Sequence, residues 1–444
     1  MNIIYNEKHF EYLKEIQNKN ILLITSLHNQ FLNVHNNELL ISYVAILDFN
    51  LEVKDEYIIN HKHEDILYKI DNLDFIQNCN VYVFNKKRVK RFINENNKIF
   101  DISLLNFINE ELIELNNHFV DYNKFINKKI YNQIIPFSIH VKNLNVQFNI
   151  LHKALIQHKD KLNDFDYLYY NFNVLDVLYD IEKNGLCIDK NLFKEIYKDK
   201  IKQHLSNNNL IYSEYNIYTS TNRPSNKYGK INFSALNKKD RTRECFISRY
   251  EDGSLYEFDY SAYHLSILAD IVNYVIPKNV KNLHEYLGKI YFNTKELTKE
   301  QYEETKTINF KLLYGGIPKE LNEITFFKLV NEYIDKLYNF YLKNKYIESH
   351  ISKRRIYNIE SPTPNKVMNY MIQMLEMEIT MNNIKKVNFF IKDKKIKIIL
   401  YVYDSILIDI DKSELKHIDK IEEILKDKYF ITTKSSTNNY KNIK

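Results

Sequence analysis

Two aspartates that follow strongly apolar strand patterns constrain the fold more than any other feature of the sequence. Asp259 ends the alternating segment Leu255-Tyr-Glu-Phe-Asp259, and Asp404 follows the apolar run Ile396–Tyr403. Because positions 259 and 404 are 145 residues apart, only the tertiary fold can bring them together. A buried carboxylate is costly unless a cation meets it, and two converging carboxylates can hold two Mg²⁺ ions for phosphoryl transfer. Taken singly, each aspartate is more simply explained as a helix or turn cap.

The composition indicates a globular chain with more than one domain. Its 444 residues, 44% hydrophobic and 27% charged, suffice for two or three domains. No apolar stretch is long enough for a membrane-spanning helix, and Met1–Lys8 lacks the pattern of a secretion signal. The cysteines are scattered and match no metal-binding spacing: Cys79, Cys187 and Cys245. We therefore expect a cytoplasmic protein with no membrane partner, whose net charge of +6 permits a polyanion partner.

Glycine and arginine are scarce, so their positions are informative. All six glycines lie between Gly185 and Gly316. Eight of the 63 basic residues are arginines, and four of these fall within 27 residues: Arg223, Arg241, Arg243 and Arg249. Where lysine is the default cation, such a cluster indicates a need for the planar guanidinium, which suits phosphates and base edges. Ordinary salt bridges are the alternative explanation.

Residues 1–165 predict a small α/β domain, because strand-like and helical patterns alternate there. The expected strands are Ile21–Thr25, Leu39–Leu47 and Val81–Phe84, and the expected helices are Lys86–Glu95 and Ile102–Leu115. The polar segment Lys159–Asp166 is the expected domain boundary.

Residues 166–444 predict a second, larger domain with long helices and a hairpin. The expected helices are Val174–Lys183 before Gly185, a stretch from Ala262, Glu296–Tyr314 before Gly315 and Gly316, and Pro362–Ile391. The expected strands are Leu255–Asp259, Ile396–Tyr403 and Ile406–Ile410, with Asp404 and Ser405 at the tip of a hairpin formed by the last two.

Two helix faces carry residues that suit nucleotide chemistry. Lys306, Phe310 and Tyr314 are four residues apart, so one helix face presents a cation and two aromatic rings, which suits a triphosphate and a base. A core face with one long lysine is the alternative. Asn369 and Gln373 also share a face and suit the acceptors of a duplex minor groove, although surface amides are common in an Asn-rich chain.

Six segments resemble, in their order along the chain, the motifs of family A DNA polymerases in a phage-like form. Phe258-Asp-Tyr-Ser-Ala-Tyr-His-Leu265 resembles motif A, and Lys306-Thr-Ile-Asn-Phe-Lys-Leu-Leu-Tyr-Gly315 is similar to motif B, Lys-x-x-x-Phe-x-x-x-Tyr-Gly. Tyr401-Val-Tyr-Asp-Ser-Ile406 resembles motif C, Val-His-Asp-Glu. The other three similar segments are Val177–Asp189, Thr219–Asn226 and Asn369–Gln373.

The resemblance implies an α+β right-hand polymerase preceded by an α/β, RNase H-like domain of exonuclease type. The first domain would span 1–165 and the polymerase domain 166–444, with the palm at about 170–265 and 366–444 and the fingers at about 266–365. The resemblance also implies the two Mg²⁺ ions as cofactors, and dNTPs and primer-template DNA as partners.

The resemblance assigns a role to each matching residue. Asp259 and Asp404 would be the metal ligands, and Lys306 would grip the triphosphate as a third catalytic residue. His284 would contact a phosphate, Phe310 the sugar, and Tyr314 the region of the templating base. The residues implied to touch the duplex are Arg223, Asn369 and Gln373, and the arginine cluster with Arg243 would share in DNA binding.

Four positions depart from the family pattern. His264 stands where motif A has a Glu that screens the sugar 2′ position, so exclusion of ribonucleotides by another bulky residue is expected. Tyr302 replaces an arginine that precedes motif B, and Lys299 is a candidate substitute for the lost phosphate contact. Ser405 replaces the Glu of motif C, which leaves two catalytic carboxylates, and Asn222 replaces a Gly that precedes Arg223.

A short thumb segment and the missing exonuclease carboxylates predict weak DNA binding and a loss of proofreading. Only 38 positions separate Gly185 from Arg223, so we expect a vestigial thumb at about 190–218, weak and salt-sensitive DNA binding, and a possible processivity or replisome partner. Segments Val81–Asn85 and Phe100–Leu105 resemble parts of a 3′–5′ exonuclease, but Ile21–Thr25 lacks its Asp-x-Glu pair. We therefore expect a degenerate exonuclease-like domain without proofreading, and an unrelated α/β domain is the alternative.

The leading interpretation is a DNA-directed DNA polymerase of phage or virus-like type, acting in the host-cell cytoplasm. A single-subunit RNA polymerase shares the three-motif logic and often has Asp-Ser in motif C, but Phe310 and the Arg223 segment favour DNA. A non-catalytic nucleic-acid-binding relative is the third possibility, which the joint presence of Asp259, Asp404 and Lys306 disfavours.

Overall fold

The computed structural model describes residues 2–13, 16–28, 35, 37–109, 128, 134–198, 209–228 and 231–443. The chain forms two compact units, Met1–Asp176 and Val177–Lys444. The division therefore falls eleven residues beyond the predicted end of the first domain at residue 165, inside helix α6 (Phe165–Asn184).

The first unit is built on a six-stranded sheet with the order β1-β4-β3-β2-β5-β6. The strands are β1 (Asn2–Ile3), β2 (Asn20–His28), β3 (Glu38–Leu47), β4 (Val53–Asn60), β5 (Asn80–Val83) and β6 (Lys98–Asp101). Strands β2, β3 and β4 pair antiparallel, whereas β5 pairs parallel with both β2 and β6. Successive residues of β2 enter two different apolar clusters, so both faces of the sheet are buried.

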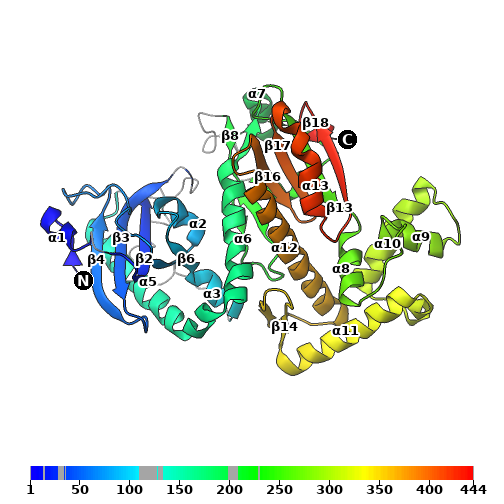
Figure 1. Ribbon diagram of the computed structural model, residues 1–444, viewed down its shortest axis with the longest axis horizontal. Helices are drawn as coiled ribbons and strands as arrows, with labels where there is room; N and C mark the ends of the chain where they lie inside the picture. Colours follow the sequence, from blue (N-terminus) through cyan, green and yellow to red (C-terminus); the bar gives the residue numbers. More distant parts are fainter. Residues whose placement is uncertain are drawn as a thin grey trace. The chain divides into compact units, whose positions relative to one another are not determined.

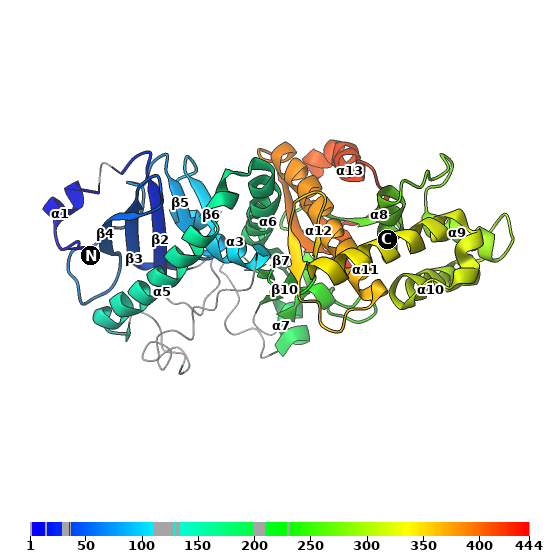
Figure 2. The same cartoon turned by 90° about the horizontal axis from the view of Figure 1, so that it is seen from below.

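Helices cover this sheet, and α5 (Phe137–Gln157) lies along one face against β2 and β3 (Figure 2). The helix predicted at 86–95 is shorter than expected: α2 (Lys86–Val89) passes into a 3₁₀ turn at Lys90–Phe92. The chain leaves the helix there because the amide of Asn97 bonds to the backbone of Ile76 and Cys79 and so holds a turn. Helix α3 covers Ile102–Asn109, and the rest of the helix predicted to Leu115 lies outside the described residues.

The second unit is built on a four-stranded antiparallel sheet with the order β16-β17-β13-β18 (Figure 1). Its strands are β13 (Ser254–Tyr260), β16 (Ile396–Val402), β17 (Ser405–Ile410) and β18 (Ile431–Ser436), and the first three confirm the predicted strands. Helices α12 (Pro364–Phe390) and α13 (Ile418–Lys426) pack on one face, where Tyr260 donates to the Leu425 carbonyl. The other face carries Leu255, Leu407 and Asp259, because alternate residues of a strand share a face.

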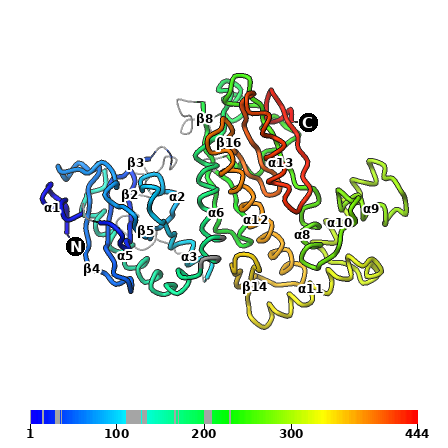
Figure 3. Tube along the Cα trace, in the orientation of Figure 1, coloured from blue at the N-terminus to red at the C-terminus, as the bar shows by residue number. Residues whose placement is uncertain are grey.

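Between β13 and α12 the chain forms a helical region that can be followed in Figure 3. Its helices are α8 (Tyr263–Ile271), α9 (Leu283–Tyr291), α10 (Lys299–Gly315) and α11 (Thr325–Asn344), followed by the hairpin β14 (Tyr346–Glu348) and β15 (Arg355–Tyr357). Helix α10 begins at a capping box of Thr298 and Gln301 and ends at Gly316, whose φ of 118° few other residues adopt. Helices α10 and α12 confirm the two long helices predicted there.

Candidate active site

Strand pairing brings the two aspartates together. In the antiparallel pair β13–β17, Asp259 lies opposite Ser405, and the backbone N–H of Tyr260 donates to the Asp404 carbonyl at 3.0 Å. Asp404 therefore sits in the hairpin turn beside the end of β13. Tyr403 enters this turn with a positive φ of 61°, and the Arg223 guanidinium lies 3.8 Å from the centre of its ring.

Both carboxylates have a raised pKa. Desolvation, followed by the negative charges of Asp259 and Glu376, raises the pKa of Asp404 to about 6. Burial also raises the pKa of Asp259, while the cations Lys238, Lys434 and Lys306 oppose this shift. A divalent cation bound to this pair would offset the repulsion between the two negative charges, so the pair is a candidate metal site.

The pair fits a Mg²⁺ site that water and substrate complete better than a metal site made of protein ligands alone. Within the described ranges, no group of three or more His, Cys, Asp or Glu side chains is placed to hold a metal ion. Mg²⁺ commonly takes one or two carboxylates and completes its shell with water and substrate phosphates. Asp259 and Asp404 supply that donor set beside an open cavity.

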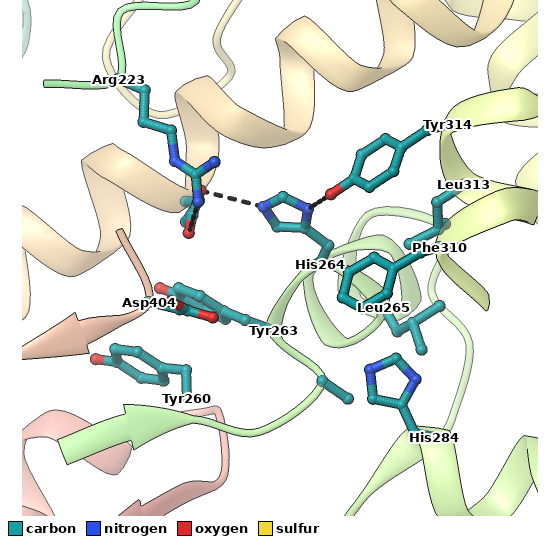
Figure 4. A pocket seen from close by; sticks show the side chains of 12 residues that line it. Arg223, Tyr260, Tyr263, His264, Leu265, His284, Phe310, Leu313, Tyr314 and Asp404 are labelled. Carbon is teal, nitrogen blue, oxygen red and sulfur yellow. Dashed lines mark hydrogen bonds and ion pairs between the residues drawn. The ribbon is translucent and has the colours of Figure 1, made fainter. Parts of the chain in front are cut away.

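A cavity of about 260 Å³ adjoins the aspartates (Figure 4). Six of the predicted site residues line it: Arg223, His264, His284, Phe310, Tyr314 and Asp404. The other lining residues are Tyr260, Ala262, Tyr263, Leu265, Leu313 and Glu376. The lining thus comes from β13, α8, α9, α10, α12, the Asp404 turn and the Arg223 segment.

Helix α10 presents the predicted row of one cation and two aromatics. Leu312 and Leu313 are buried, while Phe310 and Tyr314 stack with centroids 6.0 Å apart and remain 47% and 40% exposed. Lys306, one turn earlier, lies outside the lining residues. Its Nζ is 3.0 Å from Glu303 and 4.4 Å from the centre of the Tyr302 ring, the residue that replaces the expected arginine.

His284, at the start of α9, faces the cavity as a neutral imidazole. Burial, followed by the charge of Lys306, lowers its pKa to about 4. The Asn309 carboxamide oxygen accepts from Tyr291 at 2.7 Å, so its amide nitrogen donates to His284 Nδ1 at 2.9 Å. Nε2 of the neutral ring then carries the proton and is a donor on the cavity side.

A buried carboxylate that was not predicted from the sequence joins three of the predicted residues. Glu376 on α12 has no solvent exposure, and its oxygens lie 2.8 Å from Arg223 Nη2 and 3.1 Å from His264 Nε2. His264 Nδ1 lies 2.8 Å from the Tyr314 hydroxyl (Figure 4). A signal was present in the sequence, because a Glu within the apolar run Met374–Met377 needs a polar partner.

The remaining predicted residues lie away from the cavity lining. Asn369 and Gln373 bond to each other at 2.8 Å on α12. Arg243 is buried, with Nη1 3.5 Å from Glu257 and Nε donating to the Leu236 carbonyl. Of the four clustered arginines, Arg223 alone lines the cavity; Arg241 pairs with Glu195 and Glu244, and Arg249 pairs with Asp409.

An antiparallel sheet with two converging carboxylates beside a helix-lined cavity is the framework of an enzyme that transfers nucleotidyl groups. The family model of DNA polymerase family A matches residues 188–434, which is more than half of the chain and contains every residue of the site. The chain belongs to DNA polymerase family A and is therefore a DNA-directed DNA polymerase.

A solved structure has the same fold. It is the POL domain of Pol1 from M. smegmatis in complex with DNA primer-template and dNTP, with a TM-score of 0.74 and 13% identity over 100% of both chains. The search of curated proteins gave no match. Across the described part of the chain, no helix is long and apolar enough to cross a membrane.

Proposed function

We propose that this polymerase extends a primer 3′-hydroxyl with dNTPs on a DNA template, and that Asp259 and Asp404 hold two Mg²⁺ ions for the reaction. The observation that carries the proposal is the convergence of these two carboxylates beside a cavity lined by Phe310 and Tyr314. The fold shared with a polymerase in complex with DNA primer-template and dNTP supports the substrates. When bound, the ions would supply charge stabilisation to the attacking oxygen and to the leaving pyrophosphate.

The residues of the chain bind and orient the nucleotide. The neutral His284 offers its Nε2–H to a phosphate oxygen, and Lys306 lies on the same side of α10 as the two aromatic rings. Moving the Lys306 ammonium from Glu303 to a triphosphate exchanges an exposed surface pair, which stabilises little, for contact with several negative charges. The stacked rings of Phe310 and Tyr314 provide a flat apolar surface for the sugar and for the templating base.

Three residues are proposed to contact the duplex near the primer end. Arg223 lines the cavity and stacks on Tyr403, next to Asp404, and this position supports a contact between its guanidinium and the primer terminus. Asn369 and Gln373 follow one face of α12 and can exchange their mutual hydrogen bond for minor-groove acceptors. Arg243 has a structural role in its ion pair with Glu257, and its contact with DNA stays a prediction.

The first unit is proposed to be a degenerate relative of a 3′–5′ exonuclease. Its sheet, with antiparallel β2, β3 and β4 followed by parallel β5 and β6, has the strand order of an RNase H-like fold. The sequence of β2 contains neither Asp nor Glu, and Asp101 is used as a cap that accepts from Lys86 N at 2.6 Å and Ser103 Oγ at 2.5 Å. The ammonium groups of Lys86 and Lys90 both lie 2.8 Å from the carboxylate of Asp176, so this carboxylate is paired with two lysines. Retention of a mismatched 3′ nucleotide by the purified enzyme tests the assignment.

The thumb is proposed to be reduced, so that DNA binding is distributive without a processivity partner. Helix α7 (Lys190–Tyr197) is the helix of the predicted thumb within the described residues, and 199–208 lie outside them. Product length measured with a single-hit DNA trap tests this. Long products formed by the enzyme alone would contradict it.

The setting is proposed to be the cytoplasm of a cell that hosts a phage or virus-like replicon. Cys79, Cys187 and Cys245 are free and buried, which suits a reducing compartment. The viral origin rests on the phage-like form of the sequence motifs alone.

Primer extension tests the main proposal. The wild type and Asp404→Ala are compared on a primed DNA template with Mg²⁺, using either dNTPs or rNTPs. Extension with dNTPs that the variant loses, while it still binds the primed template, would support the proposal. Preferential use of rNTPs would instead favour RNA synthesis, and activity retained by Asp404→Ala would exclude this metal site.

A further inference from the structure

Glu376 is a fully buried carboxylate in the wall of the nucleotide cavity, and the reaction described above does not use it. It lies on α12, in a stretch where Met374, Leu375 and Met377 are also fully buried. An isolated buried carboxylate is strongly disfavoured, so its partners determine why it is there.

Its two oxygens bind different residues. Oε1 accepts from Arg223 Nη2 at 2.8 Å, and Oε2 lies 3.1 Å from His264 Nε2. A carboxylate oxygen accepts hydrogen bonds, so the imidazole is the donor in the bond between His264 Nε2 and Glu376 Oε2. His264 Nε2 therefore carries a proton.

The other ring nitrogen of His264 makes the next bond in the network. His264 Nδ1 and the Tyr314 hydroxyl lie 2.8 Å apart, so the imidazole is bonded both to the carboxylate and to the phenol. The two rings meet edge-on, with centroids 6.2 Å apart and an interplanar angle of 84°.

The network joins three elements that border the cavity. Glu376 belongs to α12, His264 to α8 and Tyr314 to α10. Figure 4 shows the His264 imidazole bonded to the Tyr314 hydroxyl, and its other ring nitrogen bonds to Glu376. Without the carboxylate, His264 could adopt the other tautomer or another rotamer, and Tyr314 would lose its defined partner. Glu376 thus determines the shape of the wall formed by His264 and Tyr314.

We propose that Glu376 is a specificity-determining positioning residue, which holds His264 and Tyr314 as a rigid wall against the 2′ position of the incoming sugar. The inference rests on the proposed dNTP site. A deoxyribose leaves this wall undisturbed, whereas a ribose 2′-hydroxyl must displace a ring that is bonded on both sides. The network acts through His264, and Glu376 itself has no role in the chemical step.

Glu378 provides a matched control on the same helix. It is also a fully buried carboxylate, but it accepts from Ser349 at 2.5 Å and from Ser352, beside the β14–β15 hairpin. Glu376→Gln and Glu378→Gln therefore both replace a buried carboxyl group of α12 with an amide, and only the first disturbs the cavity wall.

The test measures kcat and KM for one dNTP and the matching rNTP on a primed template. For Glu376→Gln, the ratio of kcat/KM values for dNTP over rNTP is expected to fall about tenfold, mainly through a lower KM for the rNTP. Glu378→Gln is expected to keep the wild-type ratio. In a His264→Ala background, Glu376→Gln should produce no further fall, because the proposed effect passes through the imidazole.

Each outcome bears on the inference. An unchanged ratio in Glu376→Gln, or an equal fall in Glu378→Gln, would overturn it. If Glu376→Gln does not fold, Tyr314→Phe decides, because it removes only the last hydrogen bond of the network and an unchanged ratio would refute the proposal. Failure of the wild type to use dNTPs would refute the proposed function, whereas failure of the ratio to change refutes only the role of Glu376.

Discussion

Competition between protons and metal at Asp404 gives a quantitative prediction. A carboxylate must lose its proton to bind a divalent cation, and the pKa of Asp404 is raised to about 6. Lowering the pH through this value protonates Asp404 in the metal-free enzyme. At pH 5, about one pH unit below this pKa, the apparent metal affinity should be about tenfold weaker than at pH 7. With an aspartate of ordinary pKa, the apparent affinities at these two pH values would differ by less than about a tenth.

Mn²⁺ binding followed by electron paramagnetic resonance provides the assay, because free and bound Mn²⁺ give different signals. Titrations at pH 5, 6 and 7 are compared for the wild type and for Asp252→Asn, which removes an exposed carboxylate paired with Lys412 on the surface. Glu376→Gln removes a negative charge that raises the pKa of Asp404, so it should move the pH midpoint downward. An affinity that stays constant between pH 5 and 7 would refute the reasoning.

Three further predictions concern stability and catalysis. Asp409→Ala should lower the free energy of unfolding, measured in urea, by about 3–5 kcal/mol, because it removes the carboxylate partner of the largely buried Arg249. A loss below about 1 kcal/mol would contradict this. Lys306→Ala should reduce kcat by about 100-fold or more with little change in DNA affinity, measured by single-turnover extension and DNA binding; a loss confined to DNA affinity would exclude the proposed role. Gly316→Ala should destabilise by about 1–3 kcal/mol in thermal unfolding because of its φ of 118°, whereas Gly315→Ala, with open space around it, should be neutral or slightly stabilising; equal effects would contradict the argument.

The elements that position the site could be predicted because their signals are local. Alternation along Leu255–Asp259 and the two apolar runs around Asp404 predict β13, β16 and β17, and a strand end fixes where each aspartate lies. The spacing of Lys306, Phe310 and Tyr314 likewise predicts a shared helix face, and both rings line the cavity.

What could not be predicted depends on contacts between distant segments. The bond from Arg223 to Glu376 spans 153 residues, and no local periodicity indicates it. The length of α2 was overestimated because the turn that ends it is held by Asn97, one of many asparagines whose individual roles the biased composition conceals. The N-terminal boundary at residue 165 was set by polarity, whereas contacts continue to Asp176 through its ion pairs with Lys86 and Lys90.

Two arginines of the cluster form ion pairs with carboxylates of the sheet in the second unit. Arg243 and Arg249 pair with Glu257 on β13 and with Asp409 on β17, two carboxylates on the same face as Asp259. A slip of one residue between these strands would put Asp409 on the face opposite to that of Glu257 and Asp259, because only the side chains of the shifted strand change face. Because the Arg249 guanidinium bonds at once to Asp409 and to the carbonyls of residues 184 and 185, it holds Asp409 in one register.

The same register places Asp259 opposite Ser405 and beside the Asp404 turn. Buried ion pairs seldom add net stability, but they penalise any pairing that separates them. Arg241, Arg243 and Arg249 therefore form the salt bridges that are the alternative explanation of the arginine cluster. In Arg243 and Arg249, the partners are carboxylates of β13 and β17, the two strands beside the proposed metal ligands. Arg223 is the arginine of the cluster that pairs with a carboxylate at the cavity. Its partner Glu376 lies on α12, the helix that packs on the other face of the sheet.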